Sequence, residues 1–247
     1  MTEQVELKSD SGNTQSSPRS KRSVMWFIVH AAVYLPLRLW CRTHAIGREN
    51  LNPDRGGILL INHQSFFDPL FVTVRLTRAV SFLARDTLFK IPFLSFILRT
   101  TFVIPISRTA FRGGSIRTAI DRLNAGYLVG IFPEGTRSAG APERFRPGFL
   151  SLARRTDLPI YPVAIVGADR VLPKGSWFAR PGRVTVIYGE QLTPKEREQV
   201  LEGKDDRAIA AMMHEKVSAL YWSVAGAVTQ DQTPPESTTE AQEQTGG

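Results

Sequence analysis

The sequence contains a single cysteine, Cys41, and four histidines. One thiol excludes an internal disulfide framework, a zinc finger and an iron–sulfur cluster. Cys41 also lies in an apolar run with no adjacent base, which argues against a thiol nucleophile. The chain has no GxSxG motif, and residues 167–176 lack the second glycine that a P-loop needs before its lysine. Serine-nucleophile hydrolases and P-loop nucleotide binding are therefore disfavoured.

Acidic residues are fewer than basic ones, 23 against 31, which gives a formal charge of +8. The two ends do not share this excess: residues 226–247 contain no Lys or Arg, and residues 1–23 are nearly balanced. The body between them holds 27 basic and 16 acidic side chains. Over the whole chain, Arg outnumbers Lys by 24 to 7. This favours anionic partners such as phospholipid headgroups, coenzyme phosphates, an acidic carrier protein or nucleic acid. The alternative is a GC-rich coding sequence that simply encodes Arg.

The chain of 247 residues is long enough for one domain with tails, and its hydrophobic fraction of 42% is enough for a sizeable core. Residues 1–23 and 226–247 have almost no large apolar groups, and we expect both to be disordered, the second as an acidic tail. We assign residues 24–45 to a membrane-associated helix and residues 46–225 to the globular domain.

The apolar run at 24–41 has 18 residues, about 27 Å as a helix and just short of the ~30 Å hydrocarbon core of a bilayer. Basic residues flank both of its ends, which gives no charge asymmetry from which to orient a span. A signal peptide is disfavoured because the run starts late and no small-residue cleavage site follows it. We favour a helix lying in the membrane interface, with Trp26, Tyr34 and Trp40 at the headgroups. A single membrane span and a packed core helix are the alternatives.

Strand and helix patterns alternate through the body, as is typical of an α/β domain. Strands are expected at 57–62, 79–85, 102–106, 127–132, 160–166 and 184–188. Helices are expected at 115–125 and 149–155, in the segment that begins with a capping box at Thr193, and at 206–221.

His63 and Asp68 follow the first of these strands in the segment NHQSFFDP. Pro69 disfavours helical geometry at Asp68, so a tight turn could fold the carboxylate onto the imidazole. Such a pair fixes one tautomer and leaves the other ring nitrogen to take a proton from a hydroxyl. A structural histidine beside a helix cap is the alternative.

A second motif, FPEGTRS at 132–138, ends another strand, where open α/β sheets place their ligand sites. Gly135 permits close backbone approach, Thr136 and Ser138 offer hydroxyls, and Arg137 suits a phosphate. The segment could also be only a strand-to-turn connection.

A metal site made of His63, Asp68 and Glu134 is disfavoured because no HxH or HExxH spacing is present. Nucleic-acid binding is disfavoured because no RNP-like or helix-turn-helix context exists.

Together, NHxxxxD and FPEGTRS about 65 residues later resemble the 1-acylglycerol-3-phosphate acyltransferase family of membrane-associated glycerolipid acyltransferases. The resemblance extends from about residue 47 to residue 190. It includes an arginine block at 101–108, with Ser107 where the family usually has an acidic residue, and glycine and proline blocks at 145–148 and 158–163. It implies a single α/β domain with a mixed sheet flanked by helices, preceded by the membrane-associated helix.

The resemblance also implies acyl transfer from acyl-CoA or acyl carrier protein to the free hydroxyl of 1-acylglycerol-3-phosphate, without cofactor or metal, at the cytoplasmic face of the cell membrane. His63 would be the general base and Asp68 would orient it. Arg108, Glu134 and Arg137 would belong to the acceptor-binding site together with Gly135 and Thr136: the two arginines would clamp the phosphate, and Glu134 would order the loop. The Gly135 N–H is a candidate oxyanion donor. The alternatives are another lysolipid or glycerol-3-phosphate as acceptor, and a non-catalytic protein that binds anionic lipid at the membrane.

Overall fold

A computed structural model describes residues 37–90, 103–106, 114–176 and 178–230, together with residues 32, 35, 95 and 98. The described strands are β1 (His44–Ile46), β2 (Gly57–Ile61), β3 (Val80–Arg85), β4 (Ile104–Ile106), β5 (Leu128–Ile131), β6 (Ile160–Val166) and β7 (Thr185–Tyr188). The described helices are α2 (Asp68–Thr73), α4 (Gly114–Asn124), α5 (Leu150–Ala153), α6 (Ala168–Val171), α7 (Pro194–Glu202) and α8 (Asp206–Gln230), with 3-10 turns at Arg48–Asn50, Asp86–Lys90 and Pro147–Phe149.

The seven strands form one mixed sheet in the order β1-β7-β6-β2-β5-β3-β4. Strands β6, β2, β5, β3 and β4 are parallel to their neighbours, whereas β7 pairs antiparallel with β6, and β1 is parallel to β7. The prediction of an α/β domain with a mixed, helix-flanked sheet is confirmed. The carboxyl ends of β2, β5 and β6 consequently meet at one edge of the sheet.

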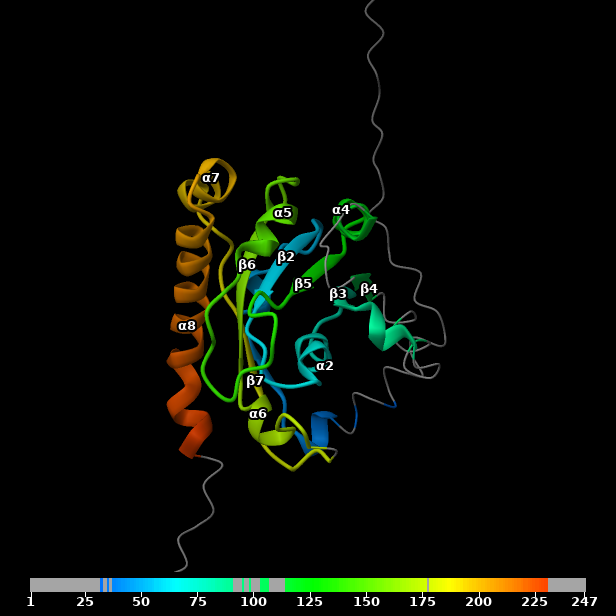
Figure 1. Ribbon diagram of the computed structural model, residues 1–247. Coiled ribbons are helices and arrows are strands. Elements are labelled where there is room, and N and C mark those ends of the chain that lie inside the picture. The colour runs from blue at the N-terminus through cyan, green and yellow to red at the C-terminus, as the bar shows by residue number, and fades with distance from the viewer. Residues whose placement is uncertain are drawn as a thin grey trace, which may run out of the picture.

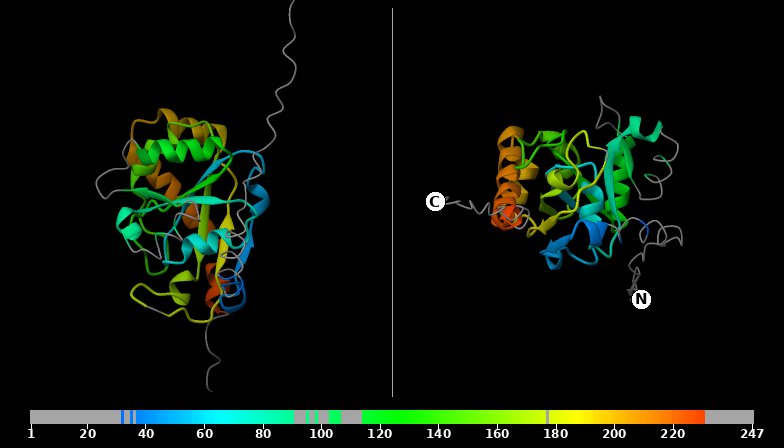
Figure 2. Two further views of the ribbon diagram at one scale, coloured as in Figure 1. Left: turned by 90° about the vertical axis from the view of Figure 1, so that its right-hand side faces the viewer. Right: turned by 90° about the horizontal axis from the view of Figure 1, so that it is seen from below.

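Two apolar cores cover the two faces of the sheet. Along β2 the side chains alternate, with Ile58 and Leu60 in one core and Leu59 and Ile61 in the other. The first core is shared with α4, α5, α7 and α8, and the second with α2 and α6. Figures 1 and 2 show α8 and α2 on opposite sides of the sheet. Burial on both faces explains why the central strands read as continuous apolar runs.

The observed elements match the expected ranges to within a few residues, with three differences. Helix α8 continues to Gln230, five residues into the predicted acidic tail. Residues 44 and 45, placed at the end of the expected membrane-associated helix, lie with Ile46 in the edge strand β1. The short elements α2 and α6 were not predicted, because four to six residues are too few to show a helical period.

Half of the expected membrane-associated helix lies outside the described residues. Its last turn, at 37–40, is helical, and Leu37 and Cys41 are buried in the core beside α2 and α6 while Leu39 and Trp40 are exposed. Within the described residues, no helix has both the length and the apolar character needed to cross a bilayer.

Candidate active site

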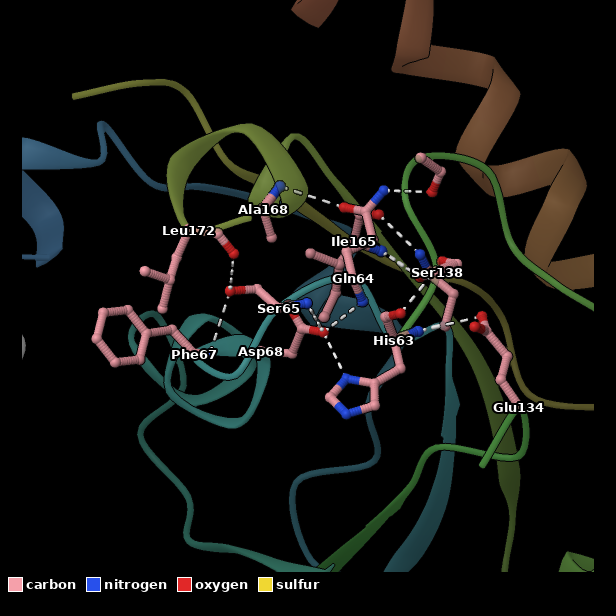
Figure 3. A network of polar contacts seen from close by, with 12 residues as sticks. His63, Gln64, Ser65, Phe67, Asp68, Glu134, Ser138, Ile165, Ala168 and Leu172 are labelled. Carbon is pink, nitrogen blue, oxygen red and sulfur yellow. Dashed lines mark hydrogen bonds and ion pairs between the residues drawn. The ribbon is translucent and has the colours of Figure 1, made fainter. Parts of the chain in front are cut away.

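The segment after β2 carries the histidine and the carboxylate singled out from the sequence. Helix α2 starts at Asp68 with Pro69 in its first turn, and the preceding residues fold back so that the carboxylate meets the imidazole. His63 Nδ1 and Asp68 Oδ2 lie 2.7 Å apart (Figure 3). The predicted contact is therefore present, although the catalytic roles of the two residues stay predictions.

The hydrogen bonds around Asp68 decide which histidine nitrogen carries the proton. Asp68 Oδ2 also accepts the backbone N–H groups of Gln64 at 2.6 Å and Ser65 at 2.8 Å. Because backbone N–H groups can only donate, Oδ2 acts as an acceptor, and the proton shared with His63 belongs to Nδ1. Nε2 is then the basic nitrogen of the ring.

The side chains of His63 and Asp68 differ in their exposure to solvent. Asp68 is fully buried, whereas the His63 side chain is 22% exposed. Burial raises the pKa of Asp68, and the hydrogen bonds from His63, Ser65 and Gln64 oppose that rise. Among the described residues, Asp68 Oδ1 has no hydrogen-bond partner. The pair thus consists of a dry, fixed carboxylate and an imidazole that solvent or a substrate can reach.

A ladder of aromatic rings supports the imidazole from behind. The ring of Phe132, the first residue of the second motif, stacks on His63 with centroids 4.3 Å apart, and Phe82 from β3 stacks on Phe132 at 5.8 Å. Gly130 on β5 makes room for this ladder, because a Cβ there would lie 2.4 Å from the Phe82 ring. The sequence reasoning gave Phe132 no role, since an apolar residue at a strand end looks like ordinary core.

The second motif also holds the backbone of His63. The carboxylate Oε1 of Glu134 accepts the His63 N–H at 3.1 Å, and the N–H and hydroxyl of Ser138 both donate to the His63 carbonyl, at 2.7 and 3.1 Å (Figure 3). Glu134 is only 2% exposed. Burial raises its pKa to about 8, over the opposing backbone hydrogen bond from His63. From this buried position its side chain holds the loop through the His63 N–H, and its part in binding the acceptor stays a prediction.

Three further polar side chains fix the loop from the other side, and the sequence reasoning missed all of them. The Asn62 amide donates to the Ile165 carbonyl at 3.0 Å and accepts the Ile165 N–H at 2.7 Å, so it replaces a backbone pair of the β2–β6 ladder. Gln64 donates to the Gly140 carbonyl and accepts the Ala168 N–H, and the Ser65 hydroxyl donates to the Leu172 carbonyl. The signal in the sequence that could have found them is that uncharged polar residues directly follow an apolar strand.

The turn after Glu134 presents the predicted acceptor-binding groups. Gly135 has a φ of +74°, a left-handed conformation that favours glycine, and its N–H donates to the Phe132 carbonyl at 3.3 Å. The N–H predicted as an oxyanion donor is therefore used to close the turn. Gly135 and Thr136 are exposed, and Arg137 is half-buried. The side chain of Arg146 packs against Gly135, so this turn carries a second arginine that was not singled out.

Three remaining expectations concern Arg108, a metal site and Cys41. Arg108 lies outside the described residues. Among the residues that the structure covers, no cluster of three or more His, Cys, Asp or Glu side chains could hold a metal ion. Cys41 is buried, and burial raises the pKa of its thiol, which suits a structural residue rather than a nucleophile.

Comparison with known proteins agrees with this geometry. Residues 42–166, about half of the chain, match the family model described as Acyltransferase, and the chain therefore belongs to the acyltransferase family.

Among curated relatives, the chain is 31% identical over 173 residues to a 1-acyl-sn-glycerol-3-phosphate acyltransferase of Chlamydomonas reinhardtii, covering 68% of this chain and 52% of that protein. It is 29% identical over 147 residues to the enzyme of the same name from Bacillus subtilis, covering 59% and 71%. The chain thus spans about half the length of the algal and plant relatives that it matches.

A solved structure matches more of the chain. The 1-acyl-sn-glycerophosphate acyltransferase PlsC from Thermotoga maritima is 27% identical, with a TM-score of 0.65, over 81% of this chain and 79% of that one.

Proposed function

We propose that this protein transfers a fatty acyl group from acyl-CoA or acyl carrier protein to the free hydroxyl of 1-acylglycerol-3-phosphate and so forms phosphatidic acid. The proposal is supported by membership of the acyltransferase family and by relatives named for this acceptor. The observation that carries it is the 2.7 Å contact between His63 Nδ1 and Asp68 Oδ2 on a loop fixed from both sides.

The proposed reaction needs one base and no enzyme nucleophile. His63 Nε2 takes the proton of the acceptor hydroxyl while its oxygen attacks the thioester carbonyl carbon. The new C–O bond forms, the C–S bond breaks, and the imidazolium returns its proton to the departing thiolate. Asp68 stabilises the imidazolium, because it accepts the Nδ1–H from a buried position.

The acceptor phosphate requires cationic groups close to the base. Arg137 lies one residue before Ser138, whose N–H and hydroxyl bond the His63 carbonyl, so its backbone is held next to the base. Its guanidinium suits a bidentate phosphate contact, and we assign Arg108 to the same role from the sequence resemblance. Together these two arginines would favour an acceptor that carries a phosphate.

A thioester-consumption assay tests the proposal. Purified full-length protein in detergent receives oleoyl-CoA with 1-acylglycerol-3-phosphate, with glycerol-3-phosphate, with other lysolipids, or without acceptor. We expect thiol release that depends on the lysophosphatidate and falls at least ~10²-fold in the His63→Ala variant. The His44→Ala variant, which changes an exposed histidine on β1, serves as the matched control and should retain the wild-type rate.

The outcomes separate the alternatives. Preference for another acceptor would keep the acyltransferase and replace its substrate. A folded His63→Ala variant with a near-normal rate would exclude the general-base role. Absence of thiol release from oleoyl-CoA and from an acyl-carrier-protein thioester, with every acceptor, would exclude the proposed activity.

A further inference from the structure

Three aromatic rings lie in a row across three neighbouring strands of the sheet, and one of them is the imidazole of His63. The strands β2, β5 and β3 are neighbours (Figure 1), and each supplies one ring: His63 follows β2, Phe132 follows β5, and Phe82 lies on β3. Phe82 is buried in the core beside α2, and Phe132 packs against the same core. The rings therefore stand together on the face of the sheet that α2 covers.

The row depends on a glycine in the middle strand. Gly130 on β5 pairs in register with Phe82, and it lies two residues before Phe132 and so on the same face. A Cβ at Gly130 would lie 2.4 Å from Cε1 and 2.6 Å from Cδ1 of Phe82, so the Phe82 ring fills the space that any other side chain would need. From this position Phe82 stacks on Phe132 with an interplanar angle of 13°. The absence of a side chain at Gly130 thus sets where both phenyl rings lie.

The hydrogen bond to Asp68 leaves one motion of the imidazole unrestrained. The bond at Nδ1 fixes one edge of the ring, but a hydrogen bond tolerates some bending, so the ring could still tilt about that edge. Such a tilt would move Nε2, on the far edge, away from a substrate hydroxyl. Phe132 lies over one face of the imidazole, with centroids 4.3 Å apart and an interplanar angle of 26°, and this stack opposes the tilt.

The stack also favours the charged form of the base. In the proposed reaction the imidazole is neutral before it takes the proton and positively charged afterwards. A cation over an aromatic face is attracted by the ring when it lies within ~6 Å of the centroid, and the stack on Phe132 is closer than this. Phe132 therefore stabilises the imidazolium from its face, as Asp68 does from its Nδ1 edge.

Asp68 and Phe132 together leave one approach to the base. Asp68 occupies the Nδ1 edge of the ring and Phe132 one of its faces, while the side chain of His63 stays 22% exposed. Figure 3 shows the opposite edge of the imidazole pointing away from the residues that hold the loop. An acceptor hydroxyl would therefore meet Nε2 in the plane of the ring, along the direction of its lone pair.

We propose that Phe132 is a positioning residue for the general base, which fixes the plane of the imidazole and stabilises its protonated form, and that Phe82 and Gly130 act through Phe132. The inference rests on the proposed function, because it assigns these three residues to the base of that reaction. Phe132 acts on the base rather than on the substrates, so its loss should slow the chemical step and leave the binding of both substrates unchanged.

Steady-state kinetics of full-length variants in detergent test this role. Phe132→Leu keeps an apolar side chain without the flat ring, and we expect kcat to fall about tenfold with unchanged KM for oleoyl-CoA and for lysophosphatidate. Phe132→Tyr keeps the ring and should retain the wild-type kcat. Phe149→Leu removes a buried ring from the core on the opposite face of the sheet and should retain it too. An unchanged kcat in Phe132→Leu, an equal fall in either of the other variants, or a change confined to KM would overturn the proposal.

A double-mutant cycle tests whether Gly130 acts through the row of rings. Gly130→Ala places a methyl group against the Phe82 ring and should lower kcat about tenfold. Phe82→Val removes the two ring atoms that this methyl group would meet and keeps a side chain suited to a strand. In the Phe82→Val background, Gly130→Ala should therefore have no further effect on kcat, whereas an equal effect in both backgrounds would contradict transmission through Phe82. Circular dichroism shows whether each variant folds, and the Phe132 variants decide the proposal if Gly130→Ala does not.

Proton NMR of the histidine rings separates this inference from the proposed function. A proton over the face of a phenyl ring is shifted upfield, so the ring protons of His63, identified by their loss in His63→Ala, should move downfield in Phe132→Leu. Those of His214, which meets the edge of the Phe145 ring with centroids 5.4 Å apart, should stay in place. Unchanged His63 signals would overturn the inference even if the wild type is an active acyltransferase. If the wild type acylates no acceptor while the His63 signals depend on Phe132, the proposed function fails and the fixing of the ring by Phe132 stands.

Discussion

Replacing Glu134 with glutamine should change how the stability of the fold depends on pH. The carboxyl group is 2% exposed, and burial raises its pKa from 4.5 to about 8. The unfolded chain loses this proton near pH 4.5, whereas the folded chain keeps it up to about pH 8. Folding therefore takes up a proton between these values, and the free energy of unfolding falls as the pH rises through this window.

The size of the effect follows from the width of the window. One pKa unit corresponds to ~1.4 kcal/mol, so the difference in pKa gives a loss of about 3 kcal/mol between pH 5 and pH 8. Glutamine retains an acceptor oxygen for the His63 N–H and cannot ionise. The Glu134→Gln variant should therefore lack this part of the pH dependence, and its stability relative to the wild type should increase steadily from pH 5 to pH 8.

Urea unfolding at a series of pH values measures this difference directly. Subtracting the wild-type free energy from that of the variant removes every other titration that the two proteins share. Glu196→Gln is the matched control, because Lys216 and Thr193 hold the pKa of Glu196 below its ordinary value and the group stays ionised across the window. Parallel wild-type and Glu134→Gln curves would refute the reasoning from burial.

Three further substitutions test other parts of the structure. Asp68→Asn should lower kcat about 10²–10⁴-fold while circular dichroism stays native, because the amide no longer stabilises the imidazolium; a rate within threefold of wild type would contradict this. Arg137→Lys should raise the KM for lysophosphatidate about tenfold with little change in the KM for acyl-CoA, because a point charge replaces a guanidinium fork, and an unchanged KM would remove Arg137 from the phosphate site. Thr193→Ala removes a capping box that the structure shows complete, and urea unfolding should show a loss of about 1 kcal/mol, whereas no loss would mean that packing alone starts α7.

The parts of the fold that the sequence predicted well are those whose periodicity is strong. The strand at Ile160–Val166 was placed to the residue, because seven apolar or β-branched positions lie between Pro159 and Gly167. The capping box at Thr193 was equally clear, since its chemistry is local. The parallel or antiparallel pairing of the strands is not local, and only the family resemblance suggested a mixed sheet.

In the candidate site too, the local contact was predicted from the sequence and the long-range contacts were not. The contact between His63 and Asp68 was predictable because Pro69 constrains the turn between them. The roles of Phe132 and Asn62 were not, because stacking on an imidazole and completing a strand pair depend on residues 69 and 103 positions away. The resemblance grouped Glu134 with the acceptor-binding residues, and its burial became visible only when β5 was placed beside β2.

The bonds that hold the loop after β2 have a consequence for how activity appears during folding. Four of them join residues separated by 71, 75, 103 and 107 positions, far beyond the local bonds to Asp68. Forming such contacts closes long loops of chain, which is the slow part of folding for a sheet of this kind. The histidine therefore acquires its fixed position only after β2, β5 and β6 have assembled. A fragment that lacks any one of these strands cannot form even part of the site.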